Sequence, residues 1–371
     1  MPKDLHKKRV DSLANATQGV IAAGSLSVTA IGTGYAVLRG GDPKHGVKQV
    51  DRMLSNAGVD LGSCMTSWCR YLIGDKKSVE VALDWTSFDN DKQSTLVAGV
   101  VADGRAAPLF WETVDDAELS DGGRTDAETA LLYRLHDAWP EDVQMTLLAD
   151  RGFGDCALYA LLQDWGWDYV IRFRQGITVR HRGQSQAAKK YLSKTGRARL
   201  LRDVRVTGKK VAIPGVVVVK DRDMKDSWCL ATSLVDGGAT PVIKAYGRRF
   251  TIEEMFRDMK DGRYGFALRQ RHVRSAPRRD KLILLFALAQ ALLILLGEAS
   301  ELAGYDRRLR VNTAKKRTHS LFRQGQYWFE ALPALSPEKA APLLEAFGVV
   351  VHNHELMRRL ILPDTPKGEQ E

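Results

Sequence analysis

Residues 246–260 read YGRRFTIEEMFRDMK, a segment that combines a helical apolar pattern with acidic and basic residues. After Thr251, apolar residues recur at the spacing of one helix face, at Ile252, Met255, Phe256 and Met259. The same helix places Glu253, Arg257 and Lys260 on its opposite, polar face. A carboxylate among cations near a helix start suits a site for a metal ion and a phosphate. A capping box between Thr251 and Glu254 on an ordinary solvated helix explains the same pattern.

The residues upstream predict an alternation of strands and helices. The expected order is three antiparallel strands in a meander, a helix, a strand, a second helix and a further strand. The strands cover residues 79–86, 94–101, 107–111, 145–149 and 168–174; the first helix covers 126–138, and the second contains Leu158, Leu161 and Leu162. Thr125 is expected to cap the first of the helices. The order predicts a sheet that mixes antiparallel and parallel strands.

Two aspartates lie at the ends of predicted strands. Asp84 belongs to the run Leu83-Asp84-Trp85-Thr86, and Asp150 follows the apolar run that ends at Ala149. If the two strands are neighbours, both carboxylates share one edge of the sheet. A strand-end aspartate alone is often only a turn former. Two of them together with Glu253 make a shared acidic site the better interpretation.

With these residues the chain resembles the DDE transposases of the bacterial insertion-sequence "four" family. The family signature Tyr-x2-Arg-x3-Glu-x6-Lys is matched at all four positions, Tyr246, Arg249, Glu253 and Lys260. The segments around Asp84 and Asp150 are similar to the first and second acid motifs of that family. The resemblance covers roughly residues 45–300. It implies an α/β fold with an RNase H-like mixed sheet flanked by helices, a β-rich insertion, and helical N- and C-terminal regions.

The expected domain organisation follows this resemblance. A helical N-terminal DNA-binding region covers residues 1–75, and the first part of the catalytic core covers 76–175. The insertion covers 176–226 and separates it from the second part of the core at 227–300. Residues 301–371 form a helical C-terminal region.

The predicted insertion is both β-rich and basic. Short β-branched runs at 177–179, 204–206 and 211–219 lie between glycine and lysine clusters. Its basic residues are Arg180, Arg182, Lys189, Lys190, Lys194, Arg197, Arg199, Arg202, Arg205, Lys209 and Lys210. Such a run is either a solvated surface or a surface that contacts a nucleic-acid strand, and we favour the second interpretation on a nuclease-like core.

A site that cleaves a phosphodiester with water is expected to need divalent metal ions. Two Mg²⁺ ions about 3.5–4 Å apart activate the water and hold the attacking and leaving oxygens in line. Mg²⁺ prefers oxygen ligands, so carboxylates suffice. We expect Asp84 to be shared by both ions, with Asp150 and Glu253 each completing one shell. Mn²⁺ is expected to substitute.

The resemblance also implies DNA contacts close to these acids. Arg249 and Lys260 are expected to bind phosphates near the scissile bond, and Tyr246 to donate a hydrogen bond to one. Arg151 is a weaker candidate for the same work. Trp228 resembles the tryptophan that stacks on a flipped base in members that cut through a hairpin, although a core tryptophan fits equally well.

Basic residues elsewhere in the chain suggest further contacts. In this family the N-terminal region contacts transposon-end DNA, which Lys44, Lys48 and Arg52 would serve here, and a plain helical cap fits the same residues. A second basic block, from Arg269 to Arg279, is expected to contact successive phosphates along the DNA backbone.

Composition agrees with a polyanionic partner. The chain has 371 residues and a net charge of +10, which favours such a partner without separating DNA from RNA or an anionic membrane. Its four cysteines show no CxxC spacing, which argues against a zinc site and agrees with a reducing cytoplasm. The apolar stretch 282–296 is shorter than a membrane span and is expected to be a buried helix.

The leading functional hypothesis is a cut-and-paste transposase that acts as a homodimer on double-stranded DNA, at terminal inverted repeats and a target. Two alternatives are a catalytically inactive, transposase-derived DNA-binding protein and a structure-specific nuclease with the same core. Three intact acids argue against the first alternative. Strand transfer separates the second from the leading hypothesis.

Overall fold

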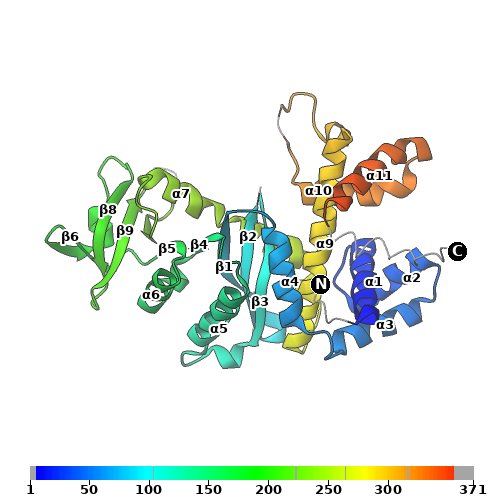
Figure 1. Cartoon of the computed structure of the whole chain (residues 1–371), viewed down its shortest axis with the longest axis horizontal. Coiled ribbons are helices and arrows are strands. Elements are labelled where there is room, and N and C mark those ends of the chain that lie inside the picture. The colour runs from blue at the N-terminus through cyan, green and yellow to red at the C-terminus, as the bar shows by residue number, and fades with distance from the viewer. Residues whose placement is uncertain (1–5, 103, 222–223, 264, 316, 355–371) are drawn as a thin grey trace.

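The computed structural model describes residues 6–102, 104–221, 224–263, 265–315 and 317–354. It confirms the predicted class, because helices flank one ten-stranded sheet that mixes parallel and antiparallel pairs (Figure 1). The strands are β1 (Ser78–Phe88), β2 (Gln93–Ala102), β3 (Arg105–Asp115), β4 (Gln144–Ala149), β5 (Asp168–Arg172), β6 (Thr178–His181), β7 (Gln184–Ala187), β8 (Arg199–Val206), β9 (Val211–Val219) and β10 (Trp228–Thr232).

The sheet has the order β3-β2-β1-β4-β5-β10-β9-β8-β6-β7. Strands β1, β2 and β3 form the predicted antiparallel meander. Strand β4 then pairs in parallel with both β1 and β5, as expected for strands that are joined through helices. The remaining pairs are antiparallel.

The helices cover the sheet and form both ends of the described chain. They are α1 (Lys7–Ala23), α2 (Val28–Arg39), α3 (Pro43–Ser55), α4 (Leu61–Ile73), α5 (Gly123–Ala138), α6 (Cys156–Asp164), α7 (Ala239–Arg248), α8 (Thr251–Lys260), α9 (Ala276–Leu302), α10 (Leu321–Ala331) and α11 (Pro337–His352). Short 3-10 turns lie at Asp89–Asp91, Asp116–Leu119, Arg151–Phe153, Ala188–Tyr191, Leu268–Gln270, Tyr305–Leu309 and Leu332–Ala334.

The predicted cap of one helix was wrong, and the capping box considered for another does not form. Helix α5 begins at Gly123 with Gly122 in the capping position, so Thr125 lies inside the first turn. Helix α8 begins at Thr251 after an αR residue, Phe250, and has no side-chain cap. The Thr251 hydroxyl instead donates to the carbonyl of Arg248 at 2.8 Å. No capping box forms, because α7 runs almost directly into α8.

The strands of the predicted insertion extend the core sheet. Strand β9 pairs with β10, in a register that sets Val216 opposite Ala231. Strands β8, β6 and β7 continue outward from β9, and Figure 1 shows them at one end of the molecule. The boundaries at 176 and 226 stay a prediction, but the basic strands share one continuous sheet with the acidic residues.

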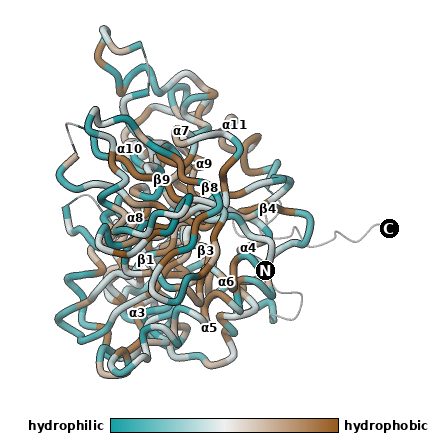
Figure 2. The backbone as a smooth tube through the Cα atoms, turned by 90° about the vertical axis from the view of Figure 1, so that its left-hand side faces the viewer, coloured by the Kyte–Doolittle hydropathy of each residue, from teal (hydrophilic) through white to brown (hydrophobic). Residues whose placement is uncertain are grey.

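Helix α9 forms the main support of the fold. Its residues 282–289 are all buried, which confirms the predicted buried helix. Helices α1, α10 and α11 pack against it. The crossing with α10 requires glycine, because a Cβ on Gly297 would lie 2.0 Å from the carbonyl oxygen of Leu321, and one on Gly325 would lie 1.8 Å from that of Leu293. In Figure 2 the interior around α9, β3 and β9 is mostly apolar.

Helix α9 is also long and apolar enough to cross a membrane, and 83% of its apolar 18-residue segment is buried inside the protein. The bent pair α1 and α2, which meet at 97°, passes only if taken together. Within the described ranges this is weak evidence for a membrane segment, because a buried core helix meets the same criteria.

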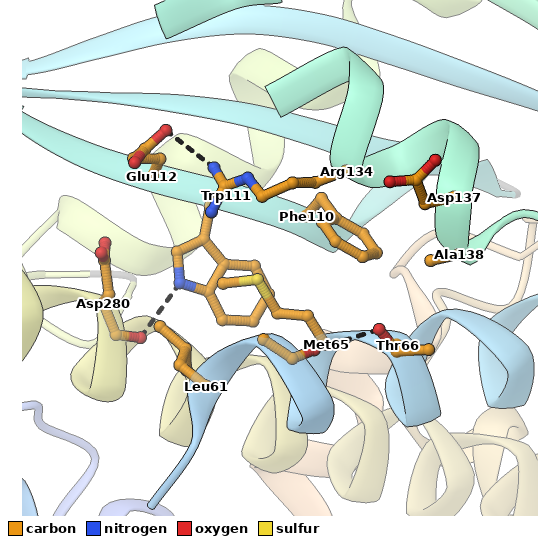
Figure 3. Close-up of a pocket in the computed structure, with 11 residues that line it drawn as sticks. Leu61, Met65, Thr66, Phe110, Trp111, Glu112, Arg134, Asp137, Ala138 and Asp280 are labelled. Carbon is orange, nitrogen blue, oxygen red and sulfur yellow. Dashed lines mark hydrogen bonds and ion pairs between the residues drawn. The ribbon is translucent and has the colours of Figure 1, made fainter. Parts of the chain in front are cut away.

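A cavity of about 300 Å³ lies beside the edge strand β3, between α4, α5 and α9. Figure 3 shows Arg134 meeting Glu112, at 2.7 Å, and the Trp111 indole donating to the backbone carbonyl of Asp280, at 3.0 Å. The Asp280 carboxylate accepts hydrogen bonds from the backbone N–H and the hydroxyl of Thr113, at 3.0 and 2.6 Å. Burial raises the pKa of Asp280 to about 7, although the two bonds from Thr113 oppose the rise.

We expect Asp280→Asn to remove a pH dependence of stability. The unfolded chain releases the Asp280 proton near the ordinary aspartate pKa of 3.8, whereas the folded chain holds it until about pH 7. The free energy of unfolding of the wild type therefore falls as pH rises between these values, by up to about 1.4 kcal/mol per pH unit. An asparagine oxygen still accepts both bonds from Thr113. Denaturant unfolding at pH 5 and pH 8 measures the free energy of unfolding of both proteins. Relative to the wild type, the variant should be more stable at pH 8 than at pH 5, and parallel pH profiles would contradict this assignment.

Candidate active site

The first two acids lie side by side where the parallel pairing of β1 with β4 ends: Asp84 lies inside β1, and Asp150 directly follows β4. In the pairing of β1 with β4, Leu83 is opposite Ala149. Asp84 and Asp150 each follow one residue later, so they occupy neighbouring positions on strands about 4.8 Å apart. Their side chains are 24% and 34% exposed. The structure therefore brings the two aspartates together, but the predicted strand end at Asp84 was wrong, because β1 continues to Phe88 in its pairing with β2.

The junction of α7 and α8 adds the third acid through one arginine. Arg249 donates from Nη1 to Asp84 Oδ2 and from Nη2 to Glu253 Oε1, both at 2.9 Å. The Tyr246 hydroxyl donates to Asp150 Oδ1 at 3.0 Å. Two signature residues thus contact all three carboxylates. We call Asp84, Asp150 and Glu253 the acidic cluster.

The cluster is closed on the protein side and open at Glu253. The Arg249 side chain is only 4% exposed, whereas that of Glu253 is 52% exposed. Burial raises the pKa of Asp84, the other two carboxylates add to the rise, and Arg249 opposes it. Burial likewise raises the pKa of Tyr246 to about 12. Tyr246 is therefore a neutral donor toward Asp150 at physiological pH.

Oxygen donors and a buried cation define what the cluster can bind. Three carboxylates without histidine or cysteine match the ligand preference of Mg²⁺ and Mn²⁺. In the described part of the chain, however, no three His, Cys, Asp or Glu side chains are close enough to hold one ion together. The Arg249 guanidinium contacts both Asp84 and Glu253 and stands between their oxygens. The donor chemistry fits a divalent ion, and Arg249 occupies the position between two of the donors.

Comparison with known proteins assigns this arrangement to a family. The profile of the transposase DDE domain matches residues 77–292, which is more than half of the chain. The chain belongs to this family of transposases. No curated protein gives a significant match. All three acids and the four signature positions lie within the matched residues, whereas α1 to α4 and α10 to α11 lie outside them.

Lys260 of the transposase lies beside the end of β1. Its ammonium donates to the Thr86 hydroxyl at 2.9 Å and to the Ser87 carbonyl at 2.8 Å, and it lies 5.0 Å from the Phe88 ring centre. Burial lowers the pKa of Lys260 to about 8, and the nearby positive charge of Arg269 adds to this. Lys260 is thus the signature cation whose charge is sensitive to moderately alkaline pH.

If Lys260 binds a DNA phosphate, its contact should weaken as pH rises through about 8. The ammonium is mostly lost one pH unit above its pKa, so we expect the affinity for end DNA to fall up to about tenfold between pH 7 and pH 9. Lys260→Arg should flatten this profile, since arginine stays charged. Fluorescence anisotropy with labelled transposon-end DNA measures the affinity of both proteins at each pH. Equal pH slopes would show that Lys260 does not make the contact.

Aromatic rings border the acidic cluster beside Tyr246. The Trp228 ring lies 4.8 Å from that of Tyr246 and 6.1 Å from that of Phe250. Trp228 is partly exposed, and Phe250 is 39% exposed. The structure therefore places Trp228 next to the signature residues, with Phe250 as a second accessible ring.

Sequence reasoning missed Phe250 and Arg172 as members of this site. Phe250 directly follows the signature arginine, so its position was the available signal. Arg172 ends β5, the parallel neighbour of β4, and its Nη1 lies 3.9 Å from Asp150 Oδ1. Its Nη2 lies 4.0 Å from Asp226. The signal for Arg172 was a cation at the end of the predicted strand that follows Asp150 in the sequence.

The other predicted DNA contacts lie at separate places on the transposase. Arg151 is exposed in the turn that follows Asp150. Lys44, Lys48 and Arg52 are on α3, among the N-terminal helices and away from β1 and β4 (Figure 1). Lys48 and Arg52 line a pocket of about 590 Å³ with Arg9 and His45. These residues form a second basic surface and do not join the acidic cluster.

One residue of the predicted second basic block does not face solvent. Arg279 is fully buried and paired with Asp91 at 2.6 Å. It has a structural role, because a guanidinium with no exposed surface does not contact a phosphate on DNA. Its neighbour Arg278 pairs with Asp51 near the surface.

Proposed function

We propose that the transposase is a cut-and-paste enzyme that cleaves the ends of a DNA element and joins them to a target. The observation that carries this proposal is the acidic cluster, in which Asp84 of β1 and Asp150, directly after β4, occupy neighbouring positions and Glu253 lies on α8. A protein that only binds DNA has no use for three carboxylates gathered beside a phosphate backbone, since like charges repel.

The acidic cluster is proposed to hold two Mg²⁺ ions, with Mn²⁺ as a substitute. Asp84 would be shared, and Asp150 and Glu253 would each serve one ion. Bound there, the ions supply an activated water and neutralise charge on the reacting phosphate. Arg249 is proposed to bind and orient that phosphate with its fork of donors, and Lys260 to add a point charge.

Tyr246 and Arg151 complete the proposed contacts near the scissile bond. Tyr246 keeps its proton at physiological pH and offers it to an oxygen, which is Asp150 Oδ1 in the structure. Arg151 is exposed one residue beyond Asp150. Both side chains would orient DNA rather than exchange protons with it.

A hairpin intermediate is part of the proposal. After the first cut, the freed 3′ hydroxyl would attack the opposite strand, and a second hydrolysis would open the hairpin. Trp228 would stack on a base displaced by this tight turn, a contact worth about 1–3 kcal/mol. Its partial exposure and the neighbouring ring of Phe250 support this role.

The surfaces away from the acidic cluster are proposed to bind longer DNA. Lys44, Lys48 and Arg52 would contact the terminal inverted repeat, while the basic strands of residues 176–226 would contact the backbone nearby. The enzyme would work as a homodimer, with one active site at each end of the element, on DNA in the bacterial cytoplasm.

The deciding experiment is a cleavage and strand-transfer assay on DNA that carries the element's terminal inverted repeats. With Mg²⁺ we expect a cut at the repeat, a hairpin product, and joining to a target plasmid. Specific binding without cleavage in Mg²⁺ or Mn²⁺ would favour a DNA-binding protein derived from a transposase. Cleavage without joining would favour a structure-specific nuclease.

A further inference from the structure

Arg249 combines three features that a simple phosphate ligand does not need. Its residue is only 3% exposed. Its two terminal nitrogens are both engaged, one by Asp84 and the other by Glu253. Its Nε is buried without a hydrogen-bond partner among the described residues. The guanidinium is therefore turned inward, toward the carboxylates, and not outward toward solvent.

Electrostatics explain why the inward position is stable. Carboxylates close together repel, and burial disfavours their charged forms, as the raised pKa of Asp84 reflects. A cation between them offsets both effects. Arginine is suited to this because its fork spans two carboxylates and it does not lose its proton. Arg249 thus supplies the positive charge that the acidic cluster requires.

Arg249 occupies the same carboxylate oxygens that a divalent ion would need. Mg²⁺ binds carboxylate oxygens at about 2.0–2.1 Å, and the oxygens concerned, Asp84 Oδ2 and Glu253 Oε1, already accept from Arg249 at 2.9 Å. Two cations cannot share this small space without strong repulsion. Since Arg249 stays protonated, it must move for an ion to bind both acids.

We propose that Arg249 is an internal competitor of the divalent ion, which holds Asp84 and Glu253 until DNA provides another partner. The inference rests on the proposed function and adds a regulation to it. A phosphate offers the guanidinium two oxygens in the geometry of a carboxylate, and it also gives the unpaired Nε an acceptor. DNA and the ion then favour each other's binding, because each removes the same competitor.

The test measures ion affinity directly, without DNA and without turnover. Mn²⁺ is titrated into the full-length protein by calorimetry, for the wild type, Arg249→Gln and Arg248→Gln. Arg248 is the matched control, since it is the adjacent arginine and pairs with Glu80, outside the acidic cluster. We expect Arg249→Gln to bind Mn²⁺ about tenfold more tightly than the wild type and Arg248→Gln to match the wild type.

Unchanged or weaker Mn²⁺ binding by Arg249→Gln would overturn the proposal, because it would show that Arg249 does not compete or is needed to position the acids. If Arg249→Gln does not fold, Arg249→Met replaces it. Methionine fills similar space without a charge or a donor, so the same tightening is expected and its absence has the same meaning. A wild type that cleaves and joins DNA while neither variant binds Mn²⁺ more tightly would refute the competition and leave the proposed function intact.

Discussion

Asp84→Asn, Asp150→Asn and Glu253→Gln should each abolish DNA cleavage, with a loss of roughly 10⁴-fold, as is common when one member of a catalytic set is removed. Each change keeps the size of the side chain and removes a negative charge. Two of the three lose an ion pair with Arg249, and Asp150→Asn loses the charge that accepts from Tyr246. Single-turnover cleavage of end DNA in Mg²⁺ measures the effect.

Glu254→Gln is the matched control for this series. Glu254 neighbours Glu253 on α8, but it pairs with Arg257 at 3.0 Å and lies 3.8 Å from Arg105, outside the acidic cluster. We expect it to retain cleavage within a few-fold of the wild type. Full activity in any of the three acid variants would remove that residue from the proposed catalytic set. Equal loss in Glu254→Gln would instead point to damage of helix α8.

The sequence predicted those parts of the fold that depend on local patterns. Strand β1 and the meander follow from β-branched runs and a turn signal, and Asp84 and Asp150 follow from where the apolar runs end. The sequence alone did not show that β1 and β4 are neighbours, because strand pairing depends on the whole sheet. Once the pairing exists, the parallel register alone brings the two aspartates together.

Side-chain direction and distant pairs could not be predicted in the same way. Helical spacing places Arg249 near Glu253, but it does not show whether the guanidinium faces DNA or Asp84, which is 165 residues away. The block that contains Arg279 is basic in the sequence and suggests an exposed surface, yet the partner of Arg279, Asp91, is 188 residues away. Thr251 fits a capping box by spacing, and the box fails because α7 leaves no free helix start.

Arg279→Ala should cause the largest loss of stability among the changes considered, about 3–5 kcal/mol. The guanidinium is fully buried and donates to Asp91 at 2.6 Å and to Gln93 at 2.8 Å, and it lies 3.8 Å above the Phe88 ring. The Asp91 side chain is itself only 6% exposed. Removing the arginine leaves this carboxylate buried without its main counter-charge, which costs far more than the pair contributes on a surface.

The pH profile and a neighbouring variant make this prediction specific. Burial raises the pKa of Asp91, but hydrogen bonds from the Val273 N–H and from Arg279 outweigh it and lower the pKa overall. Asp91 therefore stabilises the wild type above its unfolded pKa, and this contribution is lost as pH falls. In Arg279→Ala that acid-dependent loss should shrink.

Arg278→Ala, whose pair with Asp51 is partly exposed, should cost no more than about 1 kcal/mol. Denaturant unfolding at pH 7 and pH 3 measures all three proteins, because the loss occurs below the unfolded pKa of 3.8. Similar losses in both variants would show that the buried pair does not anchor the turn after β1 to α9.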